Sequence, residues 1–163
     1  MSKVKVTMEN HGEFTIELYP EFAPETVANF LKLAGSGFYD GTIFHRVVDN
    51  FMAQGGDPEG TGFGGADETI KGEFSINGVT NTLPHLYGTI SMARTQDDYD
   101  SASSQFFICH RDNSSLDGNY AAFGYTIYGL DVLNAIATTE TQTNNMPLQE
   151  VVINSIKFVD ITE

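Results

Sequence analysis

The sequence predicts a mainly β protein: a closed antiparallel β-barrel of eight strands, capped by two α-helices. Three observations predict this fold. Short stretches alternate apolar and polar residues with the period of a strand, turn residues recur about every dozen positions, and only two stretches have helical spacing. At 163 residues the chain is long enough for one domain with a buried core. We therefore expect a single domain over residues 1–163.

The chain begins with a predicted hairpin and helix. Residues 3–8 and 14–19 alternate apolar and polar, with the turn Asn10-His11-Gly12 between them. Pro24 then opens a helix at its tolerated first turn, and Glu25 favours the positive end of the helix dipole. Apolar residues recur at helical spacing until two glycines end the run; these apolar residues are Val27, Phe30, Leu31 and Ala34.

Two strands are predicted next, at residues 43–48 and 51–55, and a glycine-rich loop follows at 55–65. The loop contains Gly60-Thr-Gly62-Phe-Gly64-Gly65, which formally matches the dinucleotide-binding pattern G-x-G-x-x-G. No helical pattern follows this stretch and no βαβ unit surrounds it, so a bound phosphate would lack its helix N-terminus. We interpret the stretch as a surface loop.

The second half of the chain continues the alternation of strands and turns. Asn77-Gly78 marks a turn. The remaining predicted elements are strands at 88–93, 104–109 and 121–128, a helix at 130–137 and a closing strand at 150–160. The aromatic residues assigned to the core are Phe14, Phe30, Phe106 and Phe158.

Composition excludes several classes of function. The net charge is −14, whereas binding to nucleic acid or to anionic membranes needs clustered Lys and Arg. No stretch approaches the ~20 apolar residues of a membrane span, and no signal sequence is visible. The single cysteine, Cys109, cannot form an intramolecular disulfide. The sequence therefore predicts a cytoplasmic protein, with a monomer as the default state.

The histidines and the cysteine do not form a metal site by spacing. His11, His45, His85 and His110 are far apart, and none belongs to an H-x-x-x-H or C-x-x-C pair. We expect no metal and no cofactor. His45 precedes a residue assigned to the active face, so we expect it to point inward and to form a hydrogen bond in the core.

The most informative stretch is residues 44–56, Phe-His-Arg-Val-Val-Asp-Asn-Phe-Met-Ala-Gln-Gly-Gly. Arg46 lies there in an otherwise apolar strand-like run, and a charged guanidinium is rarely buried without a partner. A lone arginine among aromatic and aliphatic neighbours indicates a functional site.

This stretch resembles the signature of the cyclophilins, the peptidyl-prolyl cis-trans isomerases. The similarity continues, in order, at Ser91-Met92-Ala93-Arg94, at Ser103-Ser104-Gln105-Phe106-Phe107-Ile108 and at Leu116-Asp117-Gly118. Such an enzyme would act on proline-containing peptides and on unfolded or partly folded proteins. The resemblance implies a catalytic role for Arg46, a pocket for the proline ring, and contacts to the residues before proline. The pocket positions are Phe51, Met52, Phe107 and Leu116; the peptide-contacting positions are Ala93, Arg94 and Thr95.

The amide side chains Gln54 and Gln105 are expected beside this pocket. Residues two apart on a strand share a face, so Gln105 should point with Phe107, and Gln54 with Met52. We assign Gln54 to the catalytic residues. The two glutamines would hold Arg46 or the substrate backbone.

Arginine suits the chemistry of this reaction. The barrier to imide rotation, ~18–20 kcal/mol, arises from resonance between the nitrogen lone pair and the carbonyl. A donor aimed at the prolyl nitrogen becomes effective only when that nitrogen pyramidalises, which is selective binding of the transition state. The guanidinium is always charged and offers a rigid fork of five donors.

The chain departs from the well-known eukaryotic members at three positions. Ser115 replaces a Trp associated with cyclosporin binding, and the chain has no Trp, so we expect cyclosporin to bind weakly if at all. Tyr120 stands at the pocket histidine position and keeps an aromatic wall with a polar tip. Arg94 replaces Asn. Arg94 either contacts substrate or offsets the aspartates at 97, 98 and 100, and we favour the second interpretation.

Two other functions are alternatives to the isomerase. A binding module of the same fold would grip proline peptides without catalysis and would need no donor at the imide. A hydrolase would pair a serine with His45 or His85, but the sequence lacks a nucleophile elbow or any other Ser/His/Asp signature.

Overall fold

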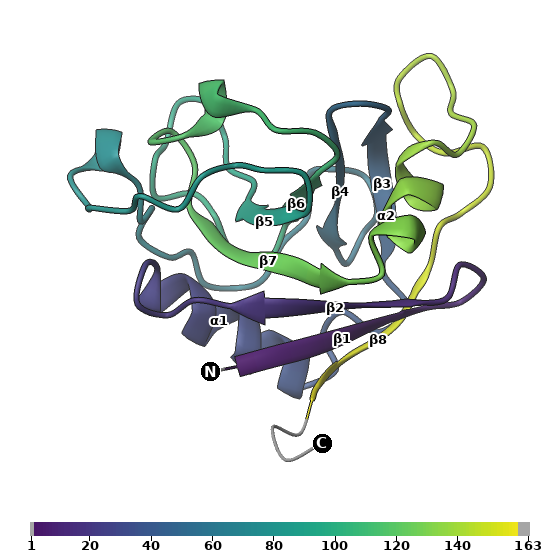
Figure 1. The fold of residues 1–163 in the computed structure, drawn as a ribbon, viewed down its shortest axis with the longest axis horizontal. Coiled ribbons are helices and arrows are strands. Elements are labelled where there is room, and N and C mark those ends of the chain that lie inside the picture. Colours follow the sequence, from purple (N-terminus) through teal and green to yellow (C-terminus); the bar gives the residue numbers. More distant parts are fainter. Residues whose placement is uncertain (1, 160–163) are drawn as a thin grey trace.

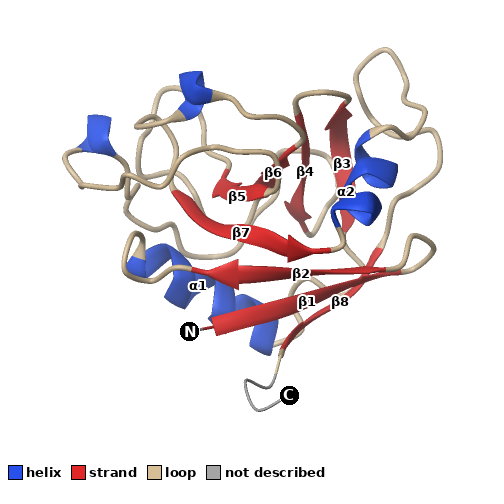
Figure 2. Cartoon of the chain, in the orientation of Figure 1, coloured by secondary structure: helices blue, strands red, loops and turns tan. Residues whose placement is uncertain are grey.

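The computed structural model describes residues 2–159, which form one antiparallel sheet of eight strands, two α-helices and two short 3₁₀ turns (Figures 1 and 2). The helices are α1 (Pro24–Gly35) and α2 (Leu130–Ala137), and the turns are η1 (Ser75–Asn77) and η2 (Ser114–Leu116). The strands are β1 (Ser2–Met8), β2 (Glu13–Leu18), β3 (Ile43–Val48), β4 (Met52–Asp57), β5 (Thr89–Met92), β6 (Phe106–Cys109), β7 (Ala122–Tyr128) and β8 (Ile153–Phe158). The predicted mainly β class is confirmed.

The sheet is an open half-barrel, so the predicted closed barrel is wrong. The strand order is β3-β4-β6-β5-β7-β2-β1-β8, which leaves β3 and β8 at the two edges. Only one isolated bridge, Ile43 to Val152, and single hydrogen bonds such as Phe44 N–H to Val151 O (3.0 Å) join these edges. The last strand was expected to begin at residue 150 but begins at Ile153, so residues 150–152 form no continuous ladder with β3. The predicted end of this strand, residue 160, lies outside the described residues.

The local sequence signals account for most element boundaries. The first hairpin closes at Gly12, where Met8 N–H donates to Gly12 O (2.8 Å) and the backbone φ of +93° favours glycine. Helix α2 occupies the predicted residues 130–137. The strand predicted at 51–55 extends to Asp57, so the glycine-rich loop, expected from residue 55, begins at Pro58.

An aromatic cluster fills the space between the sheet and α1. The ring of Phe30 on α1 contacts Tyr39, Phe106 and Phe123 at centroid distances of 5.2, 5.8 and 5.3 Å. Phe14, Phe30 and Phe106 are buried as predicted. Phe158 is 60 % exposed, so its assignment to the core is wrong. It ends β8 beside Gly35 at the end of α1, and this leaves one side of its ring open to solvent.

The N-terminus of α1 is capped from a distant part of the chain. The N-cap residue Ala23 has no side chain able to accept a hydrogen bond. The buried carboxylate of Glu73 accepts instead, from Thr26 N–H (2.7 Å), from the Thr26 hydroxyl (2.7 Å) and from Glu25 N–H (3.3 Å). Glu73 thus joins the helix to a loop that lies 47 residues beyond Thr26 in the sequence.

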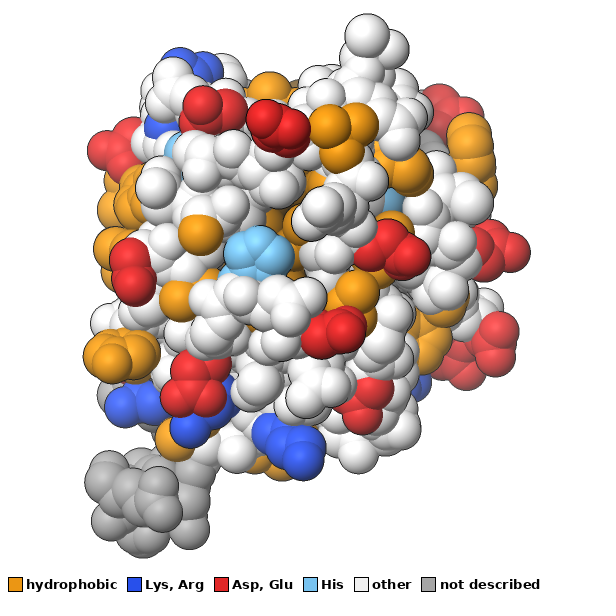
Figure 3. All heavy atoms as spheres, turned by 90° about the vertical axis from the view of Figure 1, so that its right-hand side faces the viewer, with side chains coloured by type: hydrophobic (Ala, Val, Ile, Leu, Met, Phe, Trp, Pro, Cys, Tyr) orange, Lys and Arg blue, Asp and Glu red, His pale blue; other side chains and the backbone are white. Residues whose placement is uncertain are grey.

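The charge of the protein is visible on its surface. Figure 3 shows one face over which acidic side chains are spread, with Lys and Arg only near its margins. This distribution agrees with the net charge of −14. Within residues 2–159, none of the helices combines the length and the apolar character needed to cross a bilayer.

Candidate active site

Four strands bring one row of side chains to the outer face of the sheet. Arg46 on β3 pairs with Gln54 on β4, Gln54 pairs with Phe107 on β6, and Phe107 pairs with Ser91 on β5. Residues directly opposite each other in an antiparallel sheet project to the same side. The predicted catalytic arginine, the glutamine and a pocket phenylalanine therefore lie in one line across the sheet.

A β-bulge aims Arg46 outward. On β3 the pairing steps from Phe44 to Arg46, while on β4 it steps only from Gly55 to Gln54, so His45 is an extra residue. Without the bulge, Phe44 and Arg46 would share a face. With it, Phe44 is fully buried in the core and Arg46 is exposed. The bulge thus brings the guanidinium of Arg46 to the surface, although its neighbours in the sequence are apolar.

A cavity of about 160 Å³, which we call the outer cup, lies beside this row. Its apolar floor is a small cluster separate from the main core, in which Met52 and Phe107 are buried and Phe51 and Leu116 are half-buried. The residues that line the outer cup are Arg46, Phe51, Met52, Gln54, Ala93, Arg94, Gln96, Phe107, Leu116 and Tyr120. All the residues predicted for the site line this cup except Thr95 and Gln105.

Arg46 keeps its donors free. Among the described residues no carboxylate lies within ion-pair distance of its guanidinium, which also donates no hydrogen bond to another side chain or carbonyl of residues 2–159. Gln54 is fixed next to it, because its Nε2 donates to Gln105 Oε1 (2.9 Å). The outer cup thus combines an apolar floor with an unpaired cation at its rim.

Thr95 and Gln105 line a second cavity of about 360 Å³, which we call the glycine-loop pocket. It shares Gln54, Ala93 and Arg94 with the outer cup, so the two cavities adjoin. Gln105 Nε2 donates to Gly62 O (2.9 Å) and Gly64 O (2.8 Å). Gln105 therefore holds Gln54 and the glycine loop rather than Arg46.

The glycine loop folds around an internal carboxylate. Asp57, only 1 % exposed, accepts from the backbone N–H groups of Glu59 (2.8 Å), Gly62 (2.7 Å) and Gly64 (3.2 Å), and also from Thr61. Burial acts to raise the pKa of Asp57, but these backbone donors outweigh it and the pKa is lowered. The amides that a phosphate would need are already occupied, which agrees with the interpretation of this stretch as a loop and not a nucleotide site.

Arg94 is held by aromatic rings and carbonyls. Its guanidinium carbon lies 5.1, 5.0 and 4.6 Å from the ring centroids of Phe74, Tyr99 and Tyr120. It donates to Asn119 O (2.8 and 3.2 Å) and to Thr95 O (3.0 Å). Within residues 2–159 it forms no ion pair, so none of the aspartates at 97, 98 and 100 contacts it directly, and both interpretations of its role stay predictions.

Two residues at these cavities were missed by the sequence reasoning. Gln96 lines the outer cup, and its Nε2 lies 3.4 Å from the hydroxyl of Tyr120. Phe63, 95 % exposed, stands at the edge of the glycine-loop pocket. Gln96 could have been identified because it directly follows the predicted stretch 93–95. Phe63 could have been identified because it is an aromatic residue placed between two glycines.

The structure supplies no group for metal or nucleophilic chemistry at the cup. In the part of the chain that is described, no three His, Cys, Asp or Glu side chains gather as metal ligands would. Cys109 is fully buried, and burial raises the pKa of its thiol to about 12. A thiolate at neutral pH is therefore not available.

Two buried histidines are kept neutral. His45 is buried as expected, but its Nδ1 has no hydrogen-bond partner among the described residues, so the predicted core hydrogen bond at this nitrogen is wrong. Burial lowers the pKa of His45, and nearby Arg46 lowers it further against the opposing effect of Asp57. Burial likewise lowers the pKa of His85, although Asp117 opposes this.

We expect the free energy of unfolding to fall when the pH drops below about 6.5. A histidine with a lowered pKa in the folded state binds its proton more readily when unfolded, so its contribution is complete above the unfolded pKa. This contribution to the free energy of unfolding is lost as the pH falls through the folded pKa, with a slope of at most about 1.4 kcal/mol per pH unit for each histidine. Urea unfolding at pH 7.5, 6.0 and 5.0 measures the free energy of unfolding. Equal stability at pH 7.5 and 5.0 would contradict the expectation.

The open half-barrel therefore carries an apolar cup and a free guanidinium on its outer face. Comparison with known proteins assigns the chain to a family. Residues 3–158 match the family described as "Cyclophilin type peptidyl-prolyl cis-trans isomerase/CLD". Peptidyl-prolyl cis-trans isomerase B of Bacillus subtilis is 48 % identical over 124 residues, covering 76 % of this chain and 82 % of that protein.

Relatives outside bacteria and a solved structure extend the similarity. A peptidyl-prolyl cis-trans isomerase of Arabidopsis thaliana is 38 % identical over 98 % of this chain and 96 % of its own length. The isomerase-like 2 protein of Gibberella zeae is 40 % identical over 90 % of this chain, which spans only 25 % of that larger protein. A cyclophilin type isomerase of Cryptosporidium parvum, crystallised in the presence of the dipeptide Ala-Pro, has a TM-score of 0.89 at 32 % identity over 97 % of this chain and 99 % of its own.

The chain belongs to the cyclophilin-type peptidyl-prolyl cis-trans isomerase family. It is an enzyme of this type, and the predicted isomerase function is confirmed at the level of the activity.

Proposed function

We propose that the outer cup holds the proline ring of a substrate peptide while Arg46 donates to the imide nitrogen as it loses planarity. One observation supports this most directly: Arg46 and the apolar residues Phe51, Phe107 and Leu116 line the same small cavity. Its volume of about 160 Å³ suits a single ring, because pockets for drug-sized ligands span roughly 300–1,000 Å³.

The cup and the arginine would contribute at different stages of the reaction. Contacts to the proline ring are the same in the planar and the twisted imide, so they lower KM without raising kcat. A hydrogen bond to the nitrogen forms only after its lone pair leaves the amide resonance, so it stabilises the twisted state selectively. Gln54 would accept from the substrate backbone or from Arg46, since only its Nε2 is engaged within residues 2–159.

The natural substrates would be X-Pro segments exposed in unfolded or partly folded proteins. A complex with an Ala-Pro peptide tests the site. Arrival of the proline ring among Phe51, Phe107 and Leu116 would support the proposal, whereas binding elsewhere would contradict it. Cyclosporin should bind weakly, since Ser115 offers only a hydroxyl, which already donates to Asn113.

Isomerisation should be nearly independent of pH between 6 and 8. Arginine does not titrate in this range, and the lowered pKa of His85 keeps that ring neutral. A protease-coupled assay with a Xaa-Pro peptide, corrected for the protease's own pH dependence, measures kcat/KM. A steep bell-shaped profile would instead implicate a titrating acid or base, and would contradict catalysis by Arg46 alone.

A further inference from the structure

A buried histidine lies beneath the outer cup with both ring nitrogens engaged. His85 Nδ1 is 2.9 Å from Asp117 Oδ1, and His85 Nε2 is 2.9 Å from Ser91 Oγ. The side chain of His85 and the whole of Ser91 are inaccessible to solvent. The imidazole lies at 14° to the ring of Phe107, with centroids 6.0 Å apart, so it supports the floor of the cup from below.

The chemistry of the partners fixes the direction of both hydrogen bonds. An ionised carboxylate only accepts, so His85 Nδ1 carries the hydrogen that faces Asp117. In a neutral imidazole the other nitrogen then accepts, and the Ser91 hydroxyl donates to Nε2. The neutral ring is thus satisfied by one donor and one acceptor, with no buried polar atom left unpaired.

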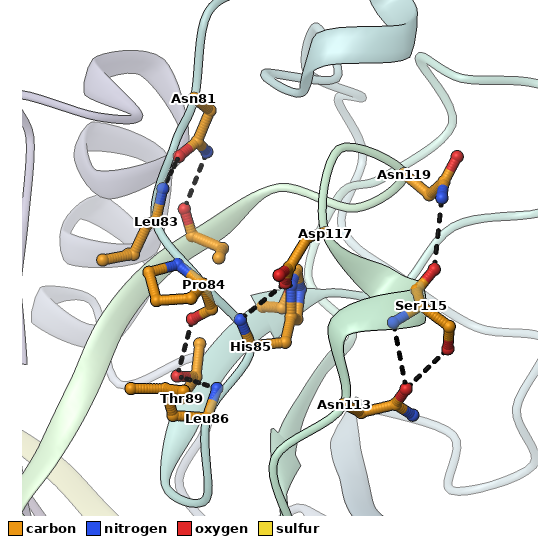
Figure 4. A network of polar contacts seen from close by, with 12 residues as sticks. Asn81, Leu83, Pro84, His85, Leu86, Thr89, Asn113, Ser115, Asp117 and Asn119 are labelled. Carbon is orange, nitrogen blue, oxygen red and sulfur yellow. Dashed lines mark hydrogen bonds and ion pairs between the residues drawn. The ribbon is translucent and has the colours of Figure 1, made fainter.

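His85 also forms hydrogen bonds to the residues that flank the turn η2, which carries Leu116, another residue that lines the cup. The backbone N–H of His85 donates to Asp117 Oδ1 (2.7 Å), and the backbone N–H of Asn113 donates to His85 O (2.8 Å). Figure 4 shows Asp117 directed at His85, at the end of the turn that includes Ser115. Leu116 immediately precedes Asp117 and lines the outer cup. His85 therefore contacts Phe107 directly, and it is linked to Leu116 through Asp117.

The order Ser91–His85–Asp117 is that of a hydrolytic triad, but the array cannot work as one. Ser91 is fully buried on the strand next to Phe107, where a substrate carbonyl cannot reach its hydroxyl. The hydrolase alternative raised by the sequence is thereby excluded for this serine.

We propose that His85, together with Asp117, is a positioning residue of the isomerase. The two hydrogen bonds to Asp117 Oδ1 hold Leu116 at a fixed distance from Phe107, and so set the width of the cup. Neither residue lines the cup or faces the substrate. The inference rests on the proposed function only in taking the outer cup as the proline site.

Two substitutions of Asp117 separate positioning from general stability. The Asp117 side chain is 38 % exposed, so its replacement leaves no buried hole at that position. Asp117→Ala removes the acceptor of both hydrogen bonds, whereas Asp117→Asn keeps an acceptor oxygen for them. We expect Asp117→Ala to lower kcat/KM for a Xaa-Pro peptide roughly tenfold, because small misplacements of contacting groups cost on this order or more. The fall should appear mainly in KM and in the peptide Kd, with kcat nearly unchanged.

A matched control lies in the same part of the chain. Asp112→Ala removes an exposed carboxylate that accepts from Tyr87 N–H (2.8 Å) but touches neither His85 nor the cup. It should leave KM unchanged, and Asp117→Asn should restore KM to near the wild-type value. Imidazole ¹⁵N shifts should show the Nδ1–H tautomer of His85 in the wild type and in Asp117→Asn, and its loss in Asp117→Ala.

The outcomes distinguish this inference from the proposed function. A folded Asp117→Ala variant with altered ¹⁵N shifts but wild-type KM and Kd would overturn the positioning role. Equal losses in the Ala and Asn variants would overturn it too, since the hydrogen bonds would then not matter. An unchanged rate in an arginine-free variant would refute the Arg46 mechanism, yet would leave the effect of Asp117→Ala on peptide Kd intact.

Discussion

Replacing Arg46 with alanine is expected to lower kcat/KM for a Xaa-Pro peptide about 100- to 1,000-fold. Loss of one preorganised donor to developing charge typically has an effect of this size, about 2.7–4 kcal/mol. The loss should fall on kcat, because the donor acts on the imide nitrogen only in the twisted state. Peptide Kd should change little, since the apolar floor of the cup contains Phe51, Met52 and Phe107 and does not include Arg46.

Two further variants show whether the donor fork or the charge matters. Arg46→Lys keeps a cation but replaces the planar fork by a point charge, so we expect a partial loss, between the alanine variant and the wild type. Arg111→Ala removes an exposed arginine outside both cavities and should have no effect. If Arg46→Ala binds peptide and isomerises it at the wild-type rate, the arginine mechanism fails. Wild-type protein that binds the peptide without any measurable catalysis would instead indicate a proline-peptide binding module.

The residues that line the cup could be predicted from the sequence far better than the backbone geometry that brings them there. Ordered motifs placed Phe51, Met52, Phe107 and Leu116 in one pocket, and strand alternation separated Phe107 from the buried Phe106. The bulge at His45 could not be predicted, because it depends on how β3 pairs with β4 and not on the residues of β3 alone. That bulge is the reason why Arg46 reaches solvent while Phe44 stays in the core.

The open edge of the sheet has a similar cause. Alternation predicted a strand from residue 150, but Val151 and Val152 meet β3 through single contacts and not through a ladder. Whether neighbouring edges close into a barrel depends on strand tilt and stagger, which a pattern of apolar residues does not specify. The local signal of Pro24 predicted the start of α1 correctly, because it acts within one turn.

The cap of α1 is a third feature that sequence proximity could not reveal. The residue before Pro24 is Ala23, which makes the helix start look uncapped. Its acceptor, Glu73, is separated from Thr26 by 47 positions and lies within a stretch that reads as an ordinary loop. A carboxylate at that end also interacts favourably with the helix dipole. The helix and the loop therefore stabilise each other only in the folded protein.

Replacing Glu73 with alanine should lower the free energy of unfolding by about 3 kcal/mol. The substitution leaves the N–H and hydroxyl of Thr26, which is fully buried, without their acceptor, at roughly 1–3 kcal/mol for each buried unsatisfied group. For a chain of this size the melting temperature should drop by roughly 6–12 °C. Glu73→Gln keeps one acceptor oxygen but brings an amide N–H₂ toward Glu25 N–H, so we expect about half the loss.

A nearby exposed carboxylate provides the control for this effect. Glu68→Ala should change stability by less than about 0.5 kcal/mol, because Glu68 is exposed and lies outside such a cap. Urea unfolding measures all three variants, and kcat/KM at low temperature should stay unchanged, since Glu73 lines neither cavity. Equal stabilities of Glu73→Ala and Glu68→Ala would mean that Thr26 finds another acceptor. The long-range cap would then contribute nothing to the fold.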